Sequence, residues 1–75
     1  MVKVTVGNNL KREAVMVDEN TTLRNVLSDA GIDYARGGMT LDGSPLQAGD
    51  LDKTFKQYNI SDTCFLLQVI KADNA

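Results

Sequence analysis

The 75-residue sequence predicts an α+β fold in which a mixed sheet of four to five strands packs on one helix. Short segments at both ends of the chain alternate apolar and polar residues with the period of two that half-buried strands show. Between them, one stretch has apolar residues at i, i+3, i+4 and i+7, which lie on one face of a helix: Leu23, Val26, Leu27 and Ala30. A chain of this length forms a single domain with one small core.

The predicted helix covers residues 21–32 and has a signal at each end. Thr21 or Thr22 can cap its N-terminus with a side-chain hydroxyl. Gly31 can turn the chain into the left-handed conformation that ends many helices, and Ile32 can fold back against the last turn. A helix of this length is not stable alone, so its apolar face must lie on the sheet.

The N-terminal segments predict an antiparallel hairpin. The valines of residues 2–6 occupy alternate positions, and residues 7–9, Gly-Asn-Asn, have turn chemistry. Residues 13–17 form the second predicted strand, with Val15 turned inward and Met16 turned outward.

The middle of the chain predicts a second, shorter hairpin. Asp42-Gly43 is the strongest hairpin-turn signal, and it follows a short strand at residues 39–41. Pro45 cannot donate a backbone hydrogen bond, so the return strand belongs at an edge of the sheet. Residues 47–60 predict an irregular loop held by apolar side chains, with one helical turn near residues 52–55.

The last strand covers Cys64 to Ile70, and its orientation is decided on Gln68, because a buried amide needs hydrogen-bond partners. The residues expected to face the helix are Phe65, Leu67 and Val69. The residues expected to face outward are Cys64, Leu66, Gln68 and Ile70. If the first and last strands pair in parallel at the centre, all apolar stripes are covered, which is a β-grasp arrangement.

Three segments in the correct order resemble ubiquitin-like proteins: Thr22-Leu23-Arg24-Asn25-Val26, Asp42-Gly43-Ser44-Pro45-Leu46 and Phe55-Lys56-Gln57-Tyr58-Asn59-Ile60. The resemblance implies one ubiquitin-like domain over residues 1–75, with residues 71–75 as a flexible tail. It also implies a structural role for Tyr58, whose ring packs under the loop and whose hydroxyl hydrogen-bonds the backbone.

Departures from the family pattern shape the functional expectation. The sequence ends Ala72-Asp73-Asn74-Ala75, without the Gly-Gly that conjugated members and sulfur carriers use. The internal Arg36-Gly37-Gly38 precedes a predicted strand and is interpreted as a turn. Thr40 stands at the family's central isoleucine position, so ubiquitin receptors are not expected to recognise the chain.

Composition excludes several classes of function. The net charge is −2, which disfavours nucleic acid as a partner, and no apolar run is long enough to span a membrane. There is no histidine, and Cys64, the single cysteine, has no partner that would make it a nucleophile. We therefore expect no enzyme activity, no metal and no cofactor, and a cytoplasmic protein. A stand-alone domain of this length without the conjugation tail is similar to bacterial or phage proteins, so we expect that origin.

The leading hypothesis is a non-catalytic, non-conjugated ubiquitin-like module that binds a protein partner. The residues expected to contact that partner on the outward face are Met16, Thr40, Leu66, Gln68 and Ile70. One alternative is a divergent modifier or sulfur carrier that acts with an activating enzyme. Another is a small self-associating adaptor, a monomer or weak homodimer that pairs through Leu66 and Ile70.

Overall fold

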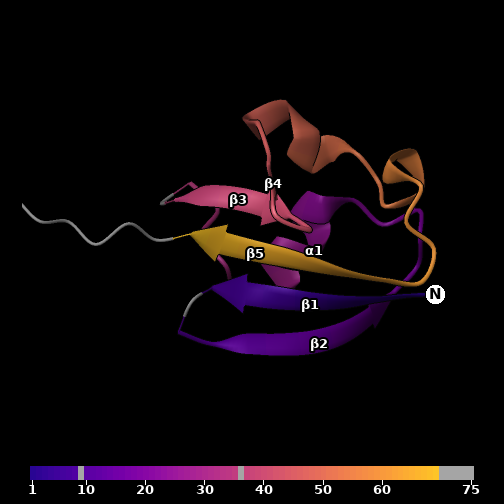
Figure 1. The fold of residues 1–75 in the computed structure, drawn as a ribbon, viewed down its shortest axis with the longest axis horizontal. Coiled ribbons are helices and arrows are strands. Elements are labelled where there is room, and N and C mark those ends of the chain that lie inside the picture. Colours follow the sequence, from indigo (N-terminus) through magenta and orange to yellow (C-terminus); the bar gives the residue numbers. More distant parts are fainter. Residues whose placement is uncertain (9, 36, 70–75) are drawn as a thin grey trace, which may run out of the picture.

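The computed structural model describes residues 1–8, 10–35 and 37–69. The elements in chain order are β1 (Val2–Asn8), β2 (Arg12–Val17), α1 (Leu23–Asp29), β3 (Gly38–Leu41), β4 (Ser44–Pro45), the 3₁₀ helices η1 (Ala48–Asp52) and η2 (Lys56–Tyr58), and β5 (Thr63–Val69). The strands form one five-stranded sheet in the order β2-β1-β5-β3-β4, and α1 lies across one face of it (Figure 1). The predicted α+β, β-grasp architecture is confirmed.

The first and last strands pair in parallel at the centre of the sheet, as the sequence predicts. Their register runs from Lys3 opposite Thr63 to Asn8 opposite Gln68. β2 pairs with β1 in antiparallel orientation, and β3 pairs with β5 in the same way. Each end of the chain therefore supplies one of the two central strands.

The β1–β2 hairpin turns through an asparagine-capped loop. The Oδ1 atom of Asn8 accepts hydrogen bonds from the backbone N–H groups of Leu10 and Lys11, at 2.8 and 2.9 Å. Gly7 is needed beside this turn because a Cβ atom there would overlap the carbonyl oxygen of Lys11. The tight approach fixes the register in which β2 runs back along β1.

Helix α1 begins and ends at the predicted signals but is shorter than the predicted range. The hydroxyl of Thr22 accepts a hydrogen bond from the N–H of Asn25 at 3.2 Å. At the other end Gly31 has φ +73°, and the N–H of Ile32 donates to the carbonyl of Leu27 at 2.9 Å. This pairing satisfies carbonyl groups that the helix leaves free and turns the chain toward the sheet.

The core lies between α1 and the inner face of the sheet. Val15 and Val17 of β2 pack against this core while only partly buried. The buried hydrophobic residues come from β1, α1, β3, η1, β5 and the loop before η2: Val2, Val4, Val6, Leu23, Val26, Leu27, Met39, Leu41, Leu51, Phe55, Cys64 and Leu66. Phe55 is the largest of the fully buried side chains, so the long loop after β4 contributes to the core as the sequence predicts.

The predicted orientation of the last strand is wrong. Its side chains that face α1 are Cys64, Leu66 and Gln68, all buried, whereas Phe65 and Val69 are 49% and 50% exposed. The physical reason is that the buried amide of Gln68 has a partner, because its Nε2 atom donates to the carbonyl oxygen of Asp33 at 2.6 Å. With that hydrogen bond made, burial of the amide is not prohibitive.

The second hairpin and the long loop agree with the sequence only in part. Asp42 and Gly43 have φ values of 51° and 87°, as a two-residue turn of the expected type requires, and Pro45 lies in the edge strand β4. The helical turn expected near residues 52–55 is replaced by η1 and η2 on either side of Thr54, which bridges to Thr22.

The hydroxyl of Tyr58 does not make the backbone hydrogen bond that the resemblance implies. Its Oη atom is buried and has no hydrogen-bond partner among the residues that the structure describes. The ring itself packs against the core, so the predicted packing role holds while the predicted hydrogen bond does not.

Candidate functional site: the open face of the sheet

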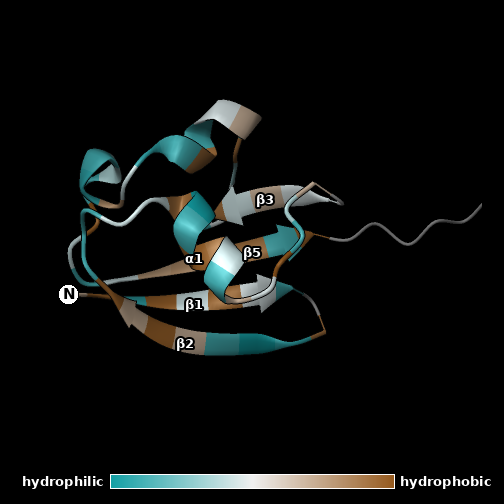
Figure 2. Cartoon of the chain, turned by 180° about the vertical axis from the view of Figure 1, so that it is seen from behind, coloured by the Kyte–Doolittle hydropathy of each residue, from teal (hydrophilic) through white to brown (hydrophobic). Residues whose placement is uncertain are grey.

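The sheet has one covered and one uncovered face. Seen from behind, α1 lies in front of the central strands (Figure 2), and no described helix crosses the opposite side. We call this second side the open face. It comprises the side chains at the outward positions of the four longer strands: Lys3, Thr5, Arg12, Ala14, Met16, Thr40, Thr63, Phe65, Leu67 and Val69.

Strand register brings the apolar members of the open face together. Thr5 of β1 lies opposite both Ala14 of β2 and Phe65 of β5. Leu67 lies two residues beyond Phe65 on the same side and opposite Thr40, whose hydroxyl donates to the Leu67 carbonyl at 3.0 Å. The result is an apolar surface along β5.

Three large apolar side chains of the open face are exposed. Met16 is 57% exposed, Val69 50% and Phe65 49%. Single exposed hydrophobic residues are ordinary, but several on one uncovered sheet face are typical of binding surfaces. The open face is therefore the candidate site.

The predicted site residues divide between the two faces. Met16 and Thr40 lie on the open face as expected. Leu66 and Gln68 are 0% and 5% exposed on the covered face, so their predicted outward placement is wrong. Ile70 lies outside the described residues. The expected homodimer surface built on Leu66 is not available, because that side chain fills the core.

Sequence reasoning missed Phe65, Leu67 and Val69, although one signal pointed to them. Free cysteine is among the most frequently buried residue types, and Cys64 is 1% exposed here. Placing Cys64 inward would have placed Phe65 outward, because neighbouring residues of a strand face opposite sides.

The charges at open-face strand positions have one sign. Lys3 of β1 and Arg12 of β2 are both basic, and both are exposed. Several acidic side chains lie elsewhere, on the helix, its following loop and η1: Asp29, Asp33, Asp50 and Asp52. One acidic group does lie beside the open face, since the Asp42 carboxylate, at the end of β3, accepts a hydrogen bond from the Phe65 N–H at 2.8 Å. The open face thus has basic groups on its β1–β2 side and an acidic group at the end of β3.

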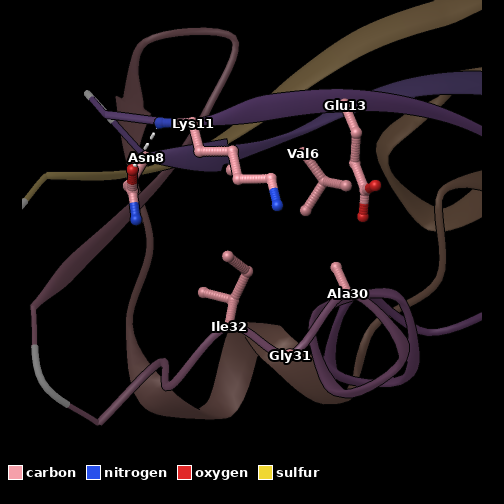
Figure 3. A pocket seen from close by; sticks show the side chains of 8 residues that line it. Val6, Asn8, Lys11, Glu13, Ala30, Gly31 and Ile32 are labelled. Atoms are coloured by element: carbon pink, nitrogen blue, oxygen red, sulfur yellow. Dashed lines mark hydrogen bonds between the residues drawn. The ribbon is translucent and has the colours of Figure 1, made fainter.

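Two hollows lie away from the open face, and neither has the side chains of a catalytic site. One, of about 270 Å³, lies between the β1–β2 hairpin and the end of α1 (Figure 3). Val6, Ala30 and Ile32 line it, and the side chains of Lys11 and Glu13 extend from the hairpin into it. It has an apolar floor with one charge of each sign and no nucleophile.

The second hollow, of about 400 Å³, lies beside η1 and contains Asp50, Lys53 and Tyr58. The Gln47 N–H donates to Asp50 at 2.9 Å, and the Lys53 ammonium lies 3.1 Å from the same carboxylate. Both interactions lower the pKa of Asp50. Burial, with the nearby Asp50 charge, raises the pKa of Tyr58, so its phenol stays protonated. These groups cap and fasten η1.

The only thiol of the chain is poorly suited to nucleophilic chemistry. Burial, and secondarily the charge of Asp42, raises the pKa of Cys64 to about 11, so the thiol is protonated at neutral pH. Within the described residues, no three His, Cys, Asp or Glu side chains gather where they could hold a metal ion. None of the helices in the described part of the chain has the length and apolar character needed to cross a bilayer.

The strand order β2-β1-β5-β3-β4 with one helix across the sheet defines a β-grasp fold. A solved structure with this architecture is that of a ubiquitin-like protein from Trypanosoma brucei, with a TM-score of 0.64 and 23% sequence identity. The likeness covers 93% of this chain and 94% of that chain, and it shows the fold. No protein-family model and no curated protein sequence matches the chain.

Proposed function

We propose that the protein is a non-catalytic ubiquitin-like module that binds a protein partner through the open face of its sheet. The observation that carries the proposal is the apolar surface of Phe65, Leu67, Val69 and Met16, which no described element covers. Binding would remove this surface from water, and each fully buried aromatic or aliphatic side chain contributes about 1.5–3 kcal/mol.

Charge favours a particular kind of partner. Lys3 and Arg12 flank the apolar surface, and complementary charges at the rim of an interface speed association and exclude wrong partners. The segment that fits this surface has apolar residues at its centre and Asp or Glu at the margin that meets Lys3 and Arg12 on β1 and β2. Nucleic acid fits poorly, because two basic side chains do not form the extended basic surface that phosphate binding requires.

In this function the protein acts by non-covalent binding through a surface, without a covalent step. The protein would therefore act without being conjugated, and it would require no cofactor. The single buried thiol of Cys64 suits the reducing conditions of the cytoplasm, where we place the function. The modifier and sulfur-carrier alternative predicts instead an adduct or a thiocarboxylate at the C-terminus, which mass spectrometry of the protein from its native host would reveal.

A capture experiment tests the assigned face. The baits are the wild type, a Phe65→Asp/Val69→Asp variant and a Leu10→Asp control, which places the same charge at an 86% exposed hairpin position away from the sheet. A protein captured by the wild type and the control but lost with the double variant supports the proposal. Equal capture by all three baits contradicts it, provided that circular dichroism shows all three to be folded.

The captured partner then allows the face to be mapped directly. Titrating it into the isotopically labelled protein should shift the backbone amide resonances of Phe65, Leu67 and Thr40. Resonances of α1 should stay in place, because the helix lies on the other side of the sheet. Shifts confined to α1 would move the site off the open face.

A further inference from the structure

The two edges of the sheet are protected very differently. The β4 edge has two residues, and one of them is Pro45, which cannot donate a backbone hydrogen bond. The β2 edge has six residues, Arg12–Val17, with no proline among them. An edge strand of this kind presents unpaired backbone groups on which another strand can assemble.

The pairing with β1 tells which groups of β2 are free. The N–H of Asn8 donates to the carbonyl of Lys11, so these two residues form a hydrogen-bonded pair. Hydrogen-bonded and non-hydrogen-bonded pairs alternate along an antiparallel ladder. The backbone N–H and C=O groups of Arg12, Ala14 and Met16 therefore point away from β1, along the outer edge of the sheet.

Charge along β2 favours one orientation for an added strand. The strand begins beside Lys11 and Arg12 and ends beside Asp18 and Glu19. Two copies of β2 placed side by side in parallel would bring like charges together. In antiparallel orientation, the basic start of each copy meets the acidic end of the other.

We propose that β2 pairs in antiparallel orientation with β2 of a second copy of this chain, with Val15 opposite Val15. In this register Arg12 lies opposite Asp18 of the other copy, and Lys11 lies opposite Glu19, each twice by symmetry. The free backbone N–H and C=O groups of Ala14 in one copy then form hydrogen bonds with those of Met16 in the other copy. A register centred on Ala14 leaves Arg12 opposite Met16 and forfeits the charge pairs.

The pairing extends the sheet without covering the open face. The two copies are related by an axis perpendicular to the sheet, so both helices lie on one side and both open faces on the other. The dimer would present two copies of the proposed binding surface in the same direction, which strengthens binding to any partner with two matching segments. The inference concerns an edge, so it holds or fails independently of the proposed function.

Hydrogen exchange of the wild-type protein gives the most direct test. On raising the protein concentration toward the order of 1 mM, where small interfaces associate, the amides of Ala14 and Met16 should exchange more slowly. The amide of Val15, already bonded to β1, serves as the internal control. If sedimentation shows a monomer at every concentration, or if the exchange of Ala14 and Met16 does not change, the proposal is overturned.

A charge swap tests the register. Arg12→Asp should raise the dimer dissociation constant on the order of tenfold, because two cross-strand attractions become repulsions. Adding Asp18→Arg should restore most of the affinity, and Lys3→Asp, the same change on β1, should leave it unchanged. Sedimentation equilibrium measures all three.

Two results of the swap would overturn the proposal. One is association that Arg12→Asp leaves intact and Phe65→Asp abolishes, which assigns the contact to the open face. The other is failure of the double swap to recover affinity. Asp18 also accepts a hydrogen bond from the Asn20 N–H, so Asp18→Asn, which keeps an acceptor there, serves as the folded variant if Asp18→Arg unfolds. It should weaken the dimer by less than Arg12→Asp, and an unchanged dissociation constant counts against the register.

Discussion

Replacing Leu66 with alanine tests the orientation of β5, on which the open face depends. Leu66 is fully buried, and the substitution removes about three methylene-sized groups, or about 2.4 kcal/mol of transfer free energy. The cavity left behind raises the loss to about 3–5 kcal/mol of unfolding free energy. A domain of this size has about 4–11 kcal/mol in total, so the substitution should remove between about a quarter and all of the stability.

The neighbouring Phe65→Ala substitution is the matched control. Phe65 is larger than Leu66 but 49% exposed, so we expect a loss of only about 1 kcal/mol. Urea unfolding followed by circular dichroism gives both free energies, and the melting temperature should fall by about 4–8 °C for each kcal/mol. If Phe65→Ala costs as much as Leu66→Ala, the strand faces the other way and the assigned open face is incorrect.

Three further predictions concern single interactions. Thr22→Ala should destabilise the protein by about 1 kcal/mol through loss of the helix cap, and Thr22→Ser should restore most of that stability. If the wild type and Thr22→Ala have equal melting temperatures, the cap contributes nothing. Gln68→Ala should lower the free energy of unfolding by about 1–3 kcal/mol, because it leaves the Asp33 carbonyl without its donor. Urea unfolding measures this loss. An unchanged free energy would mean that water replaces the amide. The raised pKa of Cys64, about 11 against an ordinary value of 9.0, should make stability fall between pH 9 and 11, since the thiol ionises more readily once unfolded. Cys64→Ala should remove that part of the pH dependence. Urea unfolding of both proteins at several pH values gives the free energy of unfolding as a function of pH. If this free energy falls equally in the two proteins between pH 9 and 11, the assignment to Cys64 is contradicted.

The sequence predicts the architecture because local signals and the global fold agree. Thr22 and Gly31 mark the helix ends, Asp42-Gly43 marks the second hairpin, and Pro45 marks the edge. Each of these signals depends on a few neighbouring residues and on their backbone conformation or hydrogen bonds, and not on where the element lies in the fold. Such features can be recognised without knowledge of the rest of the fold.

The orientation of β5 could not be found in this way. Both sides of the strand are rich in apolar residues, so alternation alone does not distinguish them. The prediction keeps the amide of Gln68 exposed, yet that amide is buried and donates to the carbonyl of Asp33, a residue 35 positions away in the sequence. No local pattern indicates that hydrogen bond, and the sequence therefore places Leu66 and Gln68 on the wrong face of the sheet.

The parallel pairing of β1 with β5 also determines when this chain can fold. Lys3 pairs with Thr63, so the centre of the sheet joins two segments that lie 60 positions apart in the sequence. During translation the β1–β2 hairpin and α1 emerge first, with the inner valines lacking their central neighbour. A nascent chain that stops before β5 has no complete core, and folding is slow to start because the closure of a long loop precedes the contacts that reward it. The native state of this domain therefore becomes accessible only after β5 has left the ribosome.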